Sequence, residues 1–460
     1  MLMEILEKQE NLELEQYVTD IKNSVTLDSI VLAVFKFALY IGSILLNEIV
    51  SERAKQHVER PSCPHCNSPL DRKGWLPRTM TTLLGFIIWD RLAWRCPKGC
   101  KIGQITPYDK TLGIQPNQET SNEIKRMVCL LAVFVPFGIA SLIFRKLTGV
   151  EVCDKSIWNW VQEAGEKGIQ KVNEELEKLN NGVDPELREL DPGVAELPMV
   201  IGGDGVTVPF RPNEGSPKGK TKWCIVNVGI IARIGSKLTK TGKKISIIVR
   251  RRVIAVLDNI NIFKNHMHLE SLKEGVCNAK QVAWLSDGGP GFWGVFRELF
   301  AKLKNVYGIL DFYHAAQNVY KGAKAKFDGR TIECKEWFEK ARKKLRLGNA
   351  AEIIQEIKKW LKIEEINRIL NKGKLSDEVV RILTNVFKYL EVHADHINYD
   401  HYKSLGLPIG SGIIESACKW VVQQRFKGVG MRWSRKGFKN LLHLRVAFLN
   451  GSFDDIFVFP

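Results

Sequence analysis

The first part of the chain alternates apolar and polar residues at helical spacing. The opening stretch MEILEKQENLELEQYVTDIKNS is acidic and amphipathic, so we expect residues 1–57 to form a helical region. Two apolar runs, at 29–46 and 127–144, approach the length of a membrane-spanning helix. Lys36 interrupts the first run and Pro136 breaks the second. We therefore predict that both runs are buried core helices, and we expect no membrane partner.

The pattern changes between residues 198 and 312, where apolar runs of strand length appear. Three runs come first, LPMVIGGDG, KWCIVNVGIIARI and KISIIVRRRVIAVL, and QVAWLS and NVYGILD follow. Helical segments near 266–276 and 291–304 separate the later runs, which gives the order β-β-β-α-β-α-β. A three-strand meander followed by parallel strands with helical crossovers indicates a mixed α/β sheet. Residues 313–405 are again helical and strongly charged.

Residues 118–168 contain three helix-like segments with the spacing of a helix-turn-helix. One helix is expected to end at Gly149, and Asp154 is expected to N-cap the next. This arrangement would present four polar side chains to DNA: Lys155, Ser156, Asn159 and Gln162. The alternative is a plain helical hairpin without a DNA contact.

Composition and charge narrow the class of protein. A chain of 460 residues is expected to form two to four domains, and 45% hydrophobic with 26% charged residues is typical of a globular protein. The 68 Lys and Arg against 51 Asp and Glu give a net charge of +17, which favours a polyanionic partner, nucleic acid before an anionic membrane. Ten cysteines without a signal peptide favour a reducing compartment.

Four of the cysteines form two close pairs within residues 58–105. Cys63 and Cys66 lie in SCPHCNSPL, and Cys96 and Cys100 lie in WRCPKGC. The segment between the pairs suits a β-hairpin, and paired cysteines at these spacings supply the four thiolates of a tetrahedral Zn²⁺ site. We predict a structural zinc ribbon, because no ligand position would remain open. The alternative is four unconnected buried cysteines.

Three carboxylates occupy positions that suit chemistry at the end of a sheet. Asp204 lies between glycines in VIGGDGV, Asp287 closes the strand QVAWLS, and Glu415 follows the Gly-Ser-Gly of LPIGSGIIESACKW. Ligands of α/β sheets gather at the carboxyl ends of strands, and carboxylate oxygens suit Mg²⁺. Two such ions assist hydrolysis or transfer at a phosphodiester. Singly, each acid has a simpler interpretation as a turn residue or a residue in the first turn of a helix.

A resemblance to a known family rests on these motifs. GGDG, LSDGG, LDFYHA at 310–315 and above all LPIGSGIIESACKWVVQQRFKGVGMRWS at 407–434 resemble insertion-sequence transposases of the ISKra type, within the DDE transposases. The similarity runs from the cysteine pairs to the C-terminus. It implies a multidomain α+β protein with a zinc ribbon, a helix-turn-helix and a ribonuclease H-like core. The core would begin at 198–312, 313–405 would be a helical insertion, and 406–460 would carry the catalytic glutamate.

The resemblance also implies DNA cleavage at element ends and strand transfer, with Asp204, Asp287 and Glu415 binding two Mg²⁺ or Mn²⁺ ions. Strand order favours Asp287 over Asp311 as the second ligand, because the fourth strand of such a core lies beside the first. Asp311 and His314 are then supporting residues.

Three basic residues after Glu415 are expected to contact DNA phosphates: Arg425, Lys427 and Arg432. Trp420 and Trp433 are expected to pack in the core rather than stack on bases. The implied partners are double-stranded DNA, as terminal repeats and target, and further copies of the chain in a dimer or larger synapse. The implied location is the bacterial cytoplasm, at the nucleoid. A nuclease that does not join DNA, and an inactive transposase-derived DNA-binding protein, remain alternatives.

Overall fold

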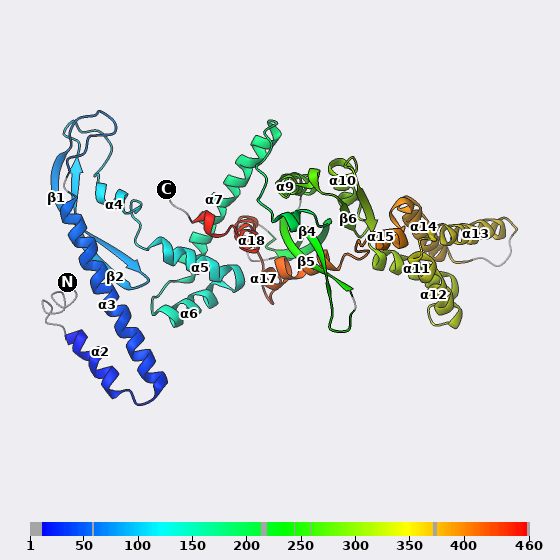
Figure 1. The fold of residues 1–460 in the computed structure, drawn as a ribbon, viewed down its shortest axis with the longest axis horizontal. Helices are drawn as coiled ribbons and strands as arrows, with labels where there is room; N and C mark the ends of the chain where they lie inside the picture. Colours follow the sequence, from blue (N-terminus) through cyan, green and yellow to red (C-terminus); the bar gives the residue numbers. More distant parts are fainter. Residues whose placement is uncertain are drawn as a thin grey trace. The chain divides into compact units, whose positions relative to one another are not determined.

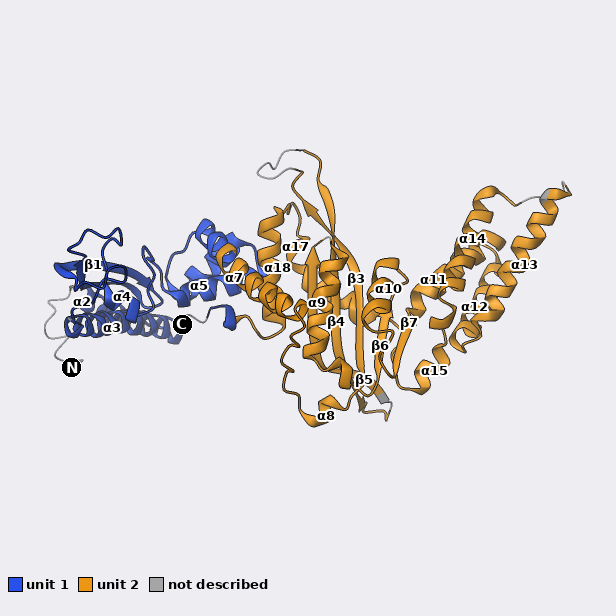
Figure 2. Ribbon diagram, turned by 90° about the horizontal axis from the view of Figure 1, so that it is seen from above, with its two compact units in different colours: residues 1–161, 454–460 blue, residues 162–453 orange. Residues whose placement is uncertain are grey.

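The computed structural model describes residues 12–57, 59–212, 219–242, 244–257, 259–370 and 375–457. The chain divides into two compact units, 1–161 with 454–460, and 162–453 (Figure 2). The boundary falls within one long helix, α7 (Asp154–Asn180). The first eleven residues of the predicted N-terminal helical region lie outside the described residues.

The first unit combines a helical hairpin, a two-stranded sheet and a set of shorter helices (Figure 1). Its elements are α2 (Leu12–Asn23), α3 (Leu27–Gln56), β1 (Asp71–Thr82), β2 (Gly85–Arg95), α4 (Pro107–Thr111), α5 (Asn122–Phe134), α6 (Phe137–Thr148) and the start of α7. β1 and β2 pair antiparallel from Asp71 with Arg95 to Thr82 with Gly85. The hairpin predicted between the two cysteine pairs is therefore present.

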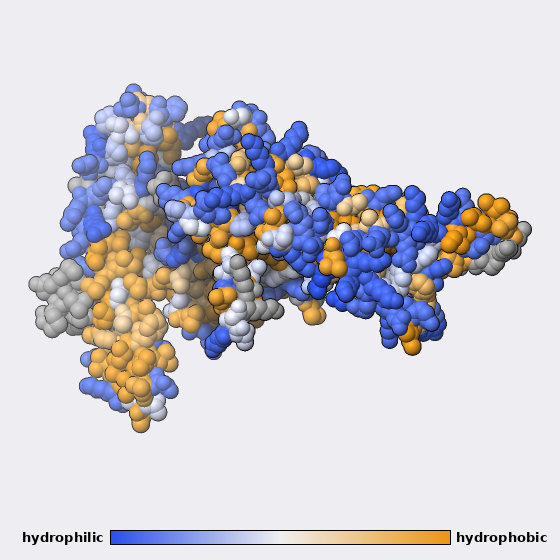
Figure 3. Space-filling model, turned by 45° about the vertical axis from the view of Figure 1, so that its right-hand side comes forward, coloured by the Kyte–Doolittle hydropathy of each residue, from blue (hydrophilic) through white to orange (hydrophobic). Residues whose placement is uncertain are grey.

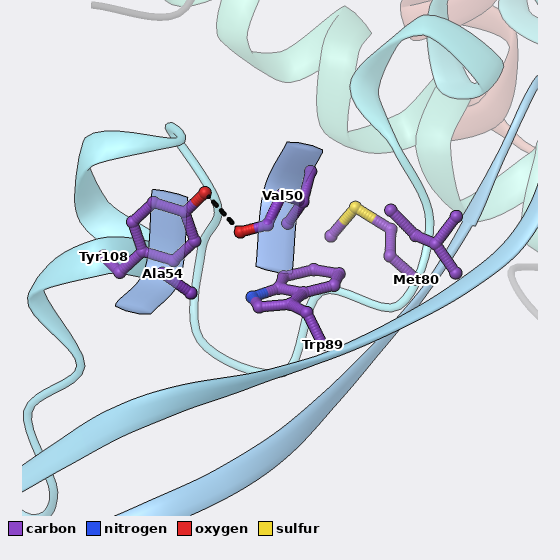
Figure 4. Packing of buried hydrophobic residues seen from close by; sticks show 6 residues of the cluster. Val50, Ala54, Met80, Trp89 and Tyr108 are labelled. Atoms are coloured by element: carbon purple, nitrogen blue, oxygen red, sulfur yellow. Dashed lines mark hydrogen bonds between the residues drawn. The ribbon is translucent and has the colours of Figure 1, made fainter. Parts of the chain in front are cut away.

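The C-terminal half of α3 packs on this hairpin through a small apolar core. Val50 and Ala54 of α3 lie against Met80, Trp89 and Tyr108, all of them buried (Figure 4). The Tyr108 hydroxyl donates a hydrogen bond to the Val50 carbonyl oxygen at 2.9 Å, so the polar end of this ring is satisfied inside the cluster.

The prediction that the apolar run at 29–46 forms a buried core helix is wrong. The run lies in α3, and no residue of the most apolar 18-residue window of that helix is buried. Apolar side chains of the run are exposed, among them Val31 (59% exposed) and Leu32 (55% exposed). Figure 3 shows that broad apolar areas lie on the surface of the protein. By length and composition alone, α3 is the one helix of the described residues that could cross a membrane.

The second apolar run, 127–144, is split between two helices, and the break falls at Pro136 as predicted. Pro136 is the N-cap of α6, and Val135 just before it is extended. Val128, Cys129 and Phe144 are buried, so this run does contribute to the core. α6 ends at Gly149 with a φ of 76°, and α7 begins at Asp154, one residue earlier than the sequence suggested.

The second unit is built on a five-stranded mixed sheet. Its strands are β3 (Met199–Phe210), β4 (Lys222–Leu238), β5 (Lys244–Leu257), β6 (Val282–Ser286) and β7 (Val306–Leu310). Their order across the sheet is β5-β4-β3-β6-β7. β3, β4 and β5 pair antiparallel, whereas β6 and β7 run parallel to β3. The predicted order of strands and helices matches this sheet.

Helices cover both faces of the sheet and extend beyond its β7 edge (Figure 2). α9 (Ile260–Lys273) starts earlier than predicted, and α10 (Pro290–Leu299) connects β6 with β7. Further helices follow β7: α11 (Phe312–Phe327), α12 (Ile332–Arg346), α13 (Ala350–Ile369), α14 (Asp377–Val392) and α15 (Tyr399–Ser404). The chain then returns through α16 (Gly412–Ala417), a π-helical turn (Cys418–Gln423), α17 (Gln424–Phe426) and α18 (Arg435–Leu449). A short α8 (Pro192–Ala195) precedes β3.

Candidate functional site

The four paired cysteines converge at the base of the hairpin. The Sγ atoms of Cys63, Cys66, Cys96 and Cys100 all lie within 4.8 Å of one another. Ser68 hydrogen-bonds Cys66 and lowers the pKa of that thiol to about 6, whereas the hydrogen bond with Cys66 raises the pKa of Cys100 to about 12. Four cysteine sulfur atoms at this separation form the donor set of a tetrahedral metal site. The cluster can therefore bind a metal ion such as zinc.

The register of β3 and β6 brings two of the predicted acids to the same end of the sheet. Met199 pairs with Val282 and Gly202 with Leu285 in a parallel ladder. Asp204 lies two residues beyond the last pair on β3, and Asp287 lies two residues beyond it on the other chain segment, just after the end of β6. Asp287 is held in a tight turn, since its Oδ1 accepts a hydrogen bond from Gly289 N at 3.0 Å and Gly288 has a φ of 96°.

Glu415 approaches the same place from α16. Burial raises the pKa of Asp204, and the negative charges of Asp287 and Glu415 raise it further. The Sγ of Cys418 donates a hydrogen bond to Asp204 Oδ2 at 3.8 Å, and Nε2 of His314 lies 3.7 Å from Glu415 Oε1. The four cysteine sulfur atoms all lie within 4.8 Å of one another. Among the described residues, the carboxylate oxygens of the three acids do not form a group that is as tight. They form a looser acidic group at one end of the sheet.

Asp311 occupies a different environment from the other acids. Its carboxylate is fully buried, with Oδ1 accepting from His314 N at 2.6 Å and Oδ2 from Ser411 N at 2.5 Å. Both oxygens thus hold backbone groups, one at the start of α11 and one just before α16. Ser411 Oγ in turn donates to Glu415 Oε1 at 3.2 Å. Asp311 therefore fixes the segment that presents Glu415.

Gly202 lets α16 lie close to β3. A Cβ at this position would collide with the Ile414 side chain and the Leu285 carbonyl oxygen. We expect Gly202→Ala to lower the free energy of unfolding by about 1–3 kcal/mol, because this tightly packed interface cannot accept an added methyl group. Urea unfolding measures the loss. Gly294→Ala in α10 is the matched control, since nothing lies within 4 Å of its added Cβ and no loss is expected.

Helix α14 reaches the Asp287 turn from more than 100 residues away in sequence. The Tyr389 hydroxyl donates to the Asp287 backbone oxygen at 2.9 Å, and the Tyr389 and His393 side chains pack against Gly288. Burial raises the pKa of Tyr389, so the phenol remains protonated and able to donate. Nothing in the local sequence around Tyr389 indicated this contact, nor the one between Cys418 and Asp204.

Tyr389→Phe removes the hydrogen bond while keeping the ring. The Asp287 carbonyl then lacks its partner, and we expect a loss of about 0.5–1.5 kcal/mol in the free energy of unfolding. If Asp287 binds a divalent ion, the looser turn should also weaken the binding of Mg²⁺. Tyr320→Phe in α11 serves as the control for removing a tyrosine hydroxyl. Identical Mg²⁺ affinity in Tyr389→Phe and wild type would contradict a positioning role.

The α7 residues that were predicted to face DNA differ in how far their side chains are exposed. Lys155 and Asn159 are exposed and Ser156 is half-buried. Gln162 is 7% exposed, and its Oε1 accepts a hydrogen bond from Asn440 Nδ2 at 2.8 Å. Gln162 therefore packs inside the second unit and does not face DNA, contrary to the prediction.

The three basic residues after Glu415 also differ in side-chain exposure. Arg425 is 2% exposed, its guanidinium lies 5.3 Å from the centre of the Trp433 ring, and burial lowers its pKa to about 10. This arginine belongs to the core, so the prediction of a phosphate contact is wrong for it. Lys427 and Arg432 are exposed, and Arg432 Nη1 donates to the Gly219 oxygen at 3.2 Å. Trp433 packs against Phe426 and Phe438.

Comparison with known proteins finds similarity among solved structures. No protein-family model matches the chain, and no curated protein sequence matches it. Among solved structures, the chain is similar to one described as "Drosophila P element transposase strand transfer complex". The TM-score is 0.27 and the sequence identity 14%, over 75% of this chain and 82% of that one.

Proposed function

We propose that this protein is a DDE-type DNA transposase with a ribonuclease H-like core, cleaving DNA at element ends and transferring the strand to a target. The observation that carries the proposal is that Asp204 on β3, Asp287 just after the adjacent parallel strand β6, and Glu415 of α16 lie close enough for the last two to raise the pKa of Asp204. The neighbouring position of the first and fourth strands, β3 and β6, supports the same proposal. The basic composition suits a DNA substrate.

The acidic group suits Mg²⁺ or Mn²⁺ by its donors. Asp204, Asp287 and Glu415 would supply hard oxygen ligands, and each brings the negative charge that holds a divalent ion. When bound, the ions would activate the attacking oxygen and stabilise the leaving oxygen.

The surrounding residues would hold the acids in place. Asp311 and Ser411 fix the start of α16, Tyr389 holds the Asp287 turn, and His314 lies against Glu415. Asp311 is proposed as a supporting residue, because both of its oxygens already accept backbone hydrogen bonds. The cysteine cluster would hold a structural zinc ion. Lys155, Asn159, Lys427 and Arg432 would contact DNA phosphates, in a dimer or larger assembly that holds two DNA ends.

A joining assay tests the proposal against its alternatives. The purified chain is incubated with Mg²⁺, a DNA fragment carrying the sequences that flank its own gene, and a supercoiled plasmid. We expect sequenced junctions in which a 3′ end of the fragment is joined to the plasmid. Cleavage without junctions would indicate a nuclease instead, and binding without cleavage would indicate a DNA-binding protein that has lost catalysis.

A further inference from the structure

An aromatic and basic pocket lies at the far end of β3 and β4, beyond the acidic group. Its volume is about 260 Å³, and its wall includes Trp223, Lys427, Met431 and Arg432. Trp223 is 59% exposed, more than any other tryptophan of the described residues. The Nζ of Lys427 lies 5.7 Å from the centre of the Trp223 ring. Among the described residues, no acidic side chain lines the pocket.

The pocket exists because β3 and β4 extend past the rest of the sheet. β6 pairs with β3 only at residues 199–202, and β5 pairs with β4 only from Val226 onward. The remainder is a two-stranded ribbon in which Pro209 pairs with Trp223. Trp223 and Ile225, two residues apart, share the exposed face of the ribbon, whereas Cys224 between them is buried on the other.

A later segment of the chain closes the pocket on one side. Arg211 N donates to the Trp433 oxygen at 2.9 Å, and Trp433 N donates to the Pro209 oxygen at 3.2 Å. These two bonds fix residues 427–433 along the end of β3 and so hold Lys427 next to the indole of Trp223. The arrangement is built by backbone pairing and does not depend on loose surface side chains.

The chemistry of the pocket selects its ligand. A flat, exposed indole with Ile225 beside it offers a stacking surface, and Lys427 and Arg432 at its rim offer positive charge. A nucleotide combines both requirements, because a base stacks on an aromatic ring while its phosphate pairs with a cation. In paired DNA the faces of the bases are covered by their neighbours, so the ligand must be an unpaired nucleotide.

We propose that this pocket binds an unpaired nucleotide of the DNA strand, with the base stacked on Trp223 and the phosphate near Lys427. The inference rests on the proposed function for its position along the substrate. Pro209 lies five residues from Asp204 on β3, which is about 17 Å at about 3.3 Å per residue. The bound nucleotide is therefore expected to lie a few nucleotides from the scissile phosphate.

Binding of short DNA by the full chain tests the pocket without any catalytic step. Anisotropy of a fluorescein-labelled twelve-nucleotide single strand, on the order of one site size, is measured without divalent ions and compared with the same sequence as a duplex. We expect Trp223→Ala to weaken single-strand binding about tenfold and duplex binding much less. Trp223→Phe should retain most of the affinity. Trp75→Ala, at the exposed Trp75 of β1 (39% exposed), should leave single-strand binding unchanged.

Two results would overturn the proposal: unchanged single-strand binding in Trp223→Ala, or an equal loss for single strand and duplex. Circular dichroism of each variant confirms that it is folded, as expected for the truncation of an exposed side chain. Since the assay contains no divalent ion, a failure of the catalytic proposal would leave its result unchanged. A Trp223→Ala variant that cleaves DNA normally yet has lost single-strand binding would still support the pocket.

Discussion

Asp204→Asn is expected to lower the rate of Mg²⁺-dependent DNA cleavage by on the order of 10³-fold or more, with the fold preserved. Ligation of the catalytic ions contributes several kcal/mol to stabilising the transition state, and each 1.36 kcal/mol corresponds to about tenfold in rate. Asn has nearly the shape of Asp but lacks its charge. Because burial and the neighbouring acids already raise the pKa of Asp204, removing its charge should not destabilise the protein. Single-turnover cleavage and thermal unfolding measure the two quantities.

Asp287→Asn and Glu415→Gln are expected to behave in the same way, whereas Asp311→Asn should not. The buried Asp311 carboxylate accepts two backbone hydrogen bonds, and an amide would direct its NH₂ group at one of those donors. We expect Asp311→Asn to lose about 1.5–3 kcal/mol in the free energy of unfolding. Glu186→Gln, at an exposed acid in the connector before β3, is the control for removing a charge. If Asp311→Asn were stable but did not cleave DNA, and Asp287→Asn remained active, Asp311 would be the metal ligand and Asp287 the supporting residue.

If the cysteine cluster holds a zinc ion, chelation is expected to unfold the cysteine end of the hairpin. This end has only a small core of its own, formed by Cys63 and Cys96 with Leu70, Leu92 and Trp94, whereas the other end packs on α3. A structural zinc ion contributes about 10–16 kcal/mol of apparent binding free energy in small domains, which far exceeds what such a core provides. We therefore expect one zinc ion per chain, and loss of protease resistance across residues 58–105 after chelation.

Cys63→Ser should reproduce the effect of chelation. Its metal content, measured by atomic emission, should fall below one zinc per chain, and the hairpin should become sensitive to protease. Cys277→Ser is the matched control, because Cys277 is exposed and lies outside the cluster. A Cys63→Ser protein that keeps one zinc ion and a resistant hairpin would contradict the proposed ribbon.

The features that the sequence predicted best are those in which a local pattern of residues is compatible with one structure only. Long apolar runs such as that of β3 had to form buried strands, and the crossovers through α9 and α10 set β6 and β7 parallel to β3. Paired cysteines at short spacing predicted the cluster for the same reason, because each pair already lies on one tight turn.

Features that depend on tertiary contacts were missed or predicted wrongly. Arg425 sits in a basic stretch that suggests a surface, yet the Trp433 and Phe426 rings enclose its guanidinium. The apolar run of α3 suggests a core helix, yet only its C-terminal part packs on the hairpin. The Tyr389 contact with Asp287 spans 102 positions, and no local spacing encodes it.

The location of bound divalent ions tests the central claim most directly. Crystals of the full chain soaked in Mn²⁺ give an anomalous difference map that shows the ions independently of any activity assay. The account predicts peaks between the carboxylates of Asp204, Asp287 and Glu415, which are lost in Asp204→Asn crystals. Mn²⁺ bound elsewhere on the protein, with no peak at these three residues, would contradict the proposed active site.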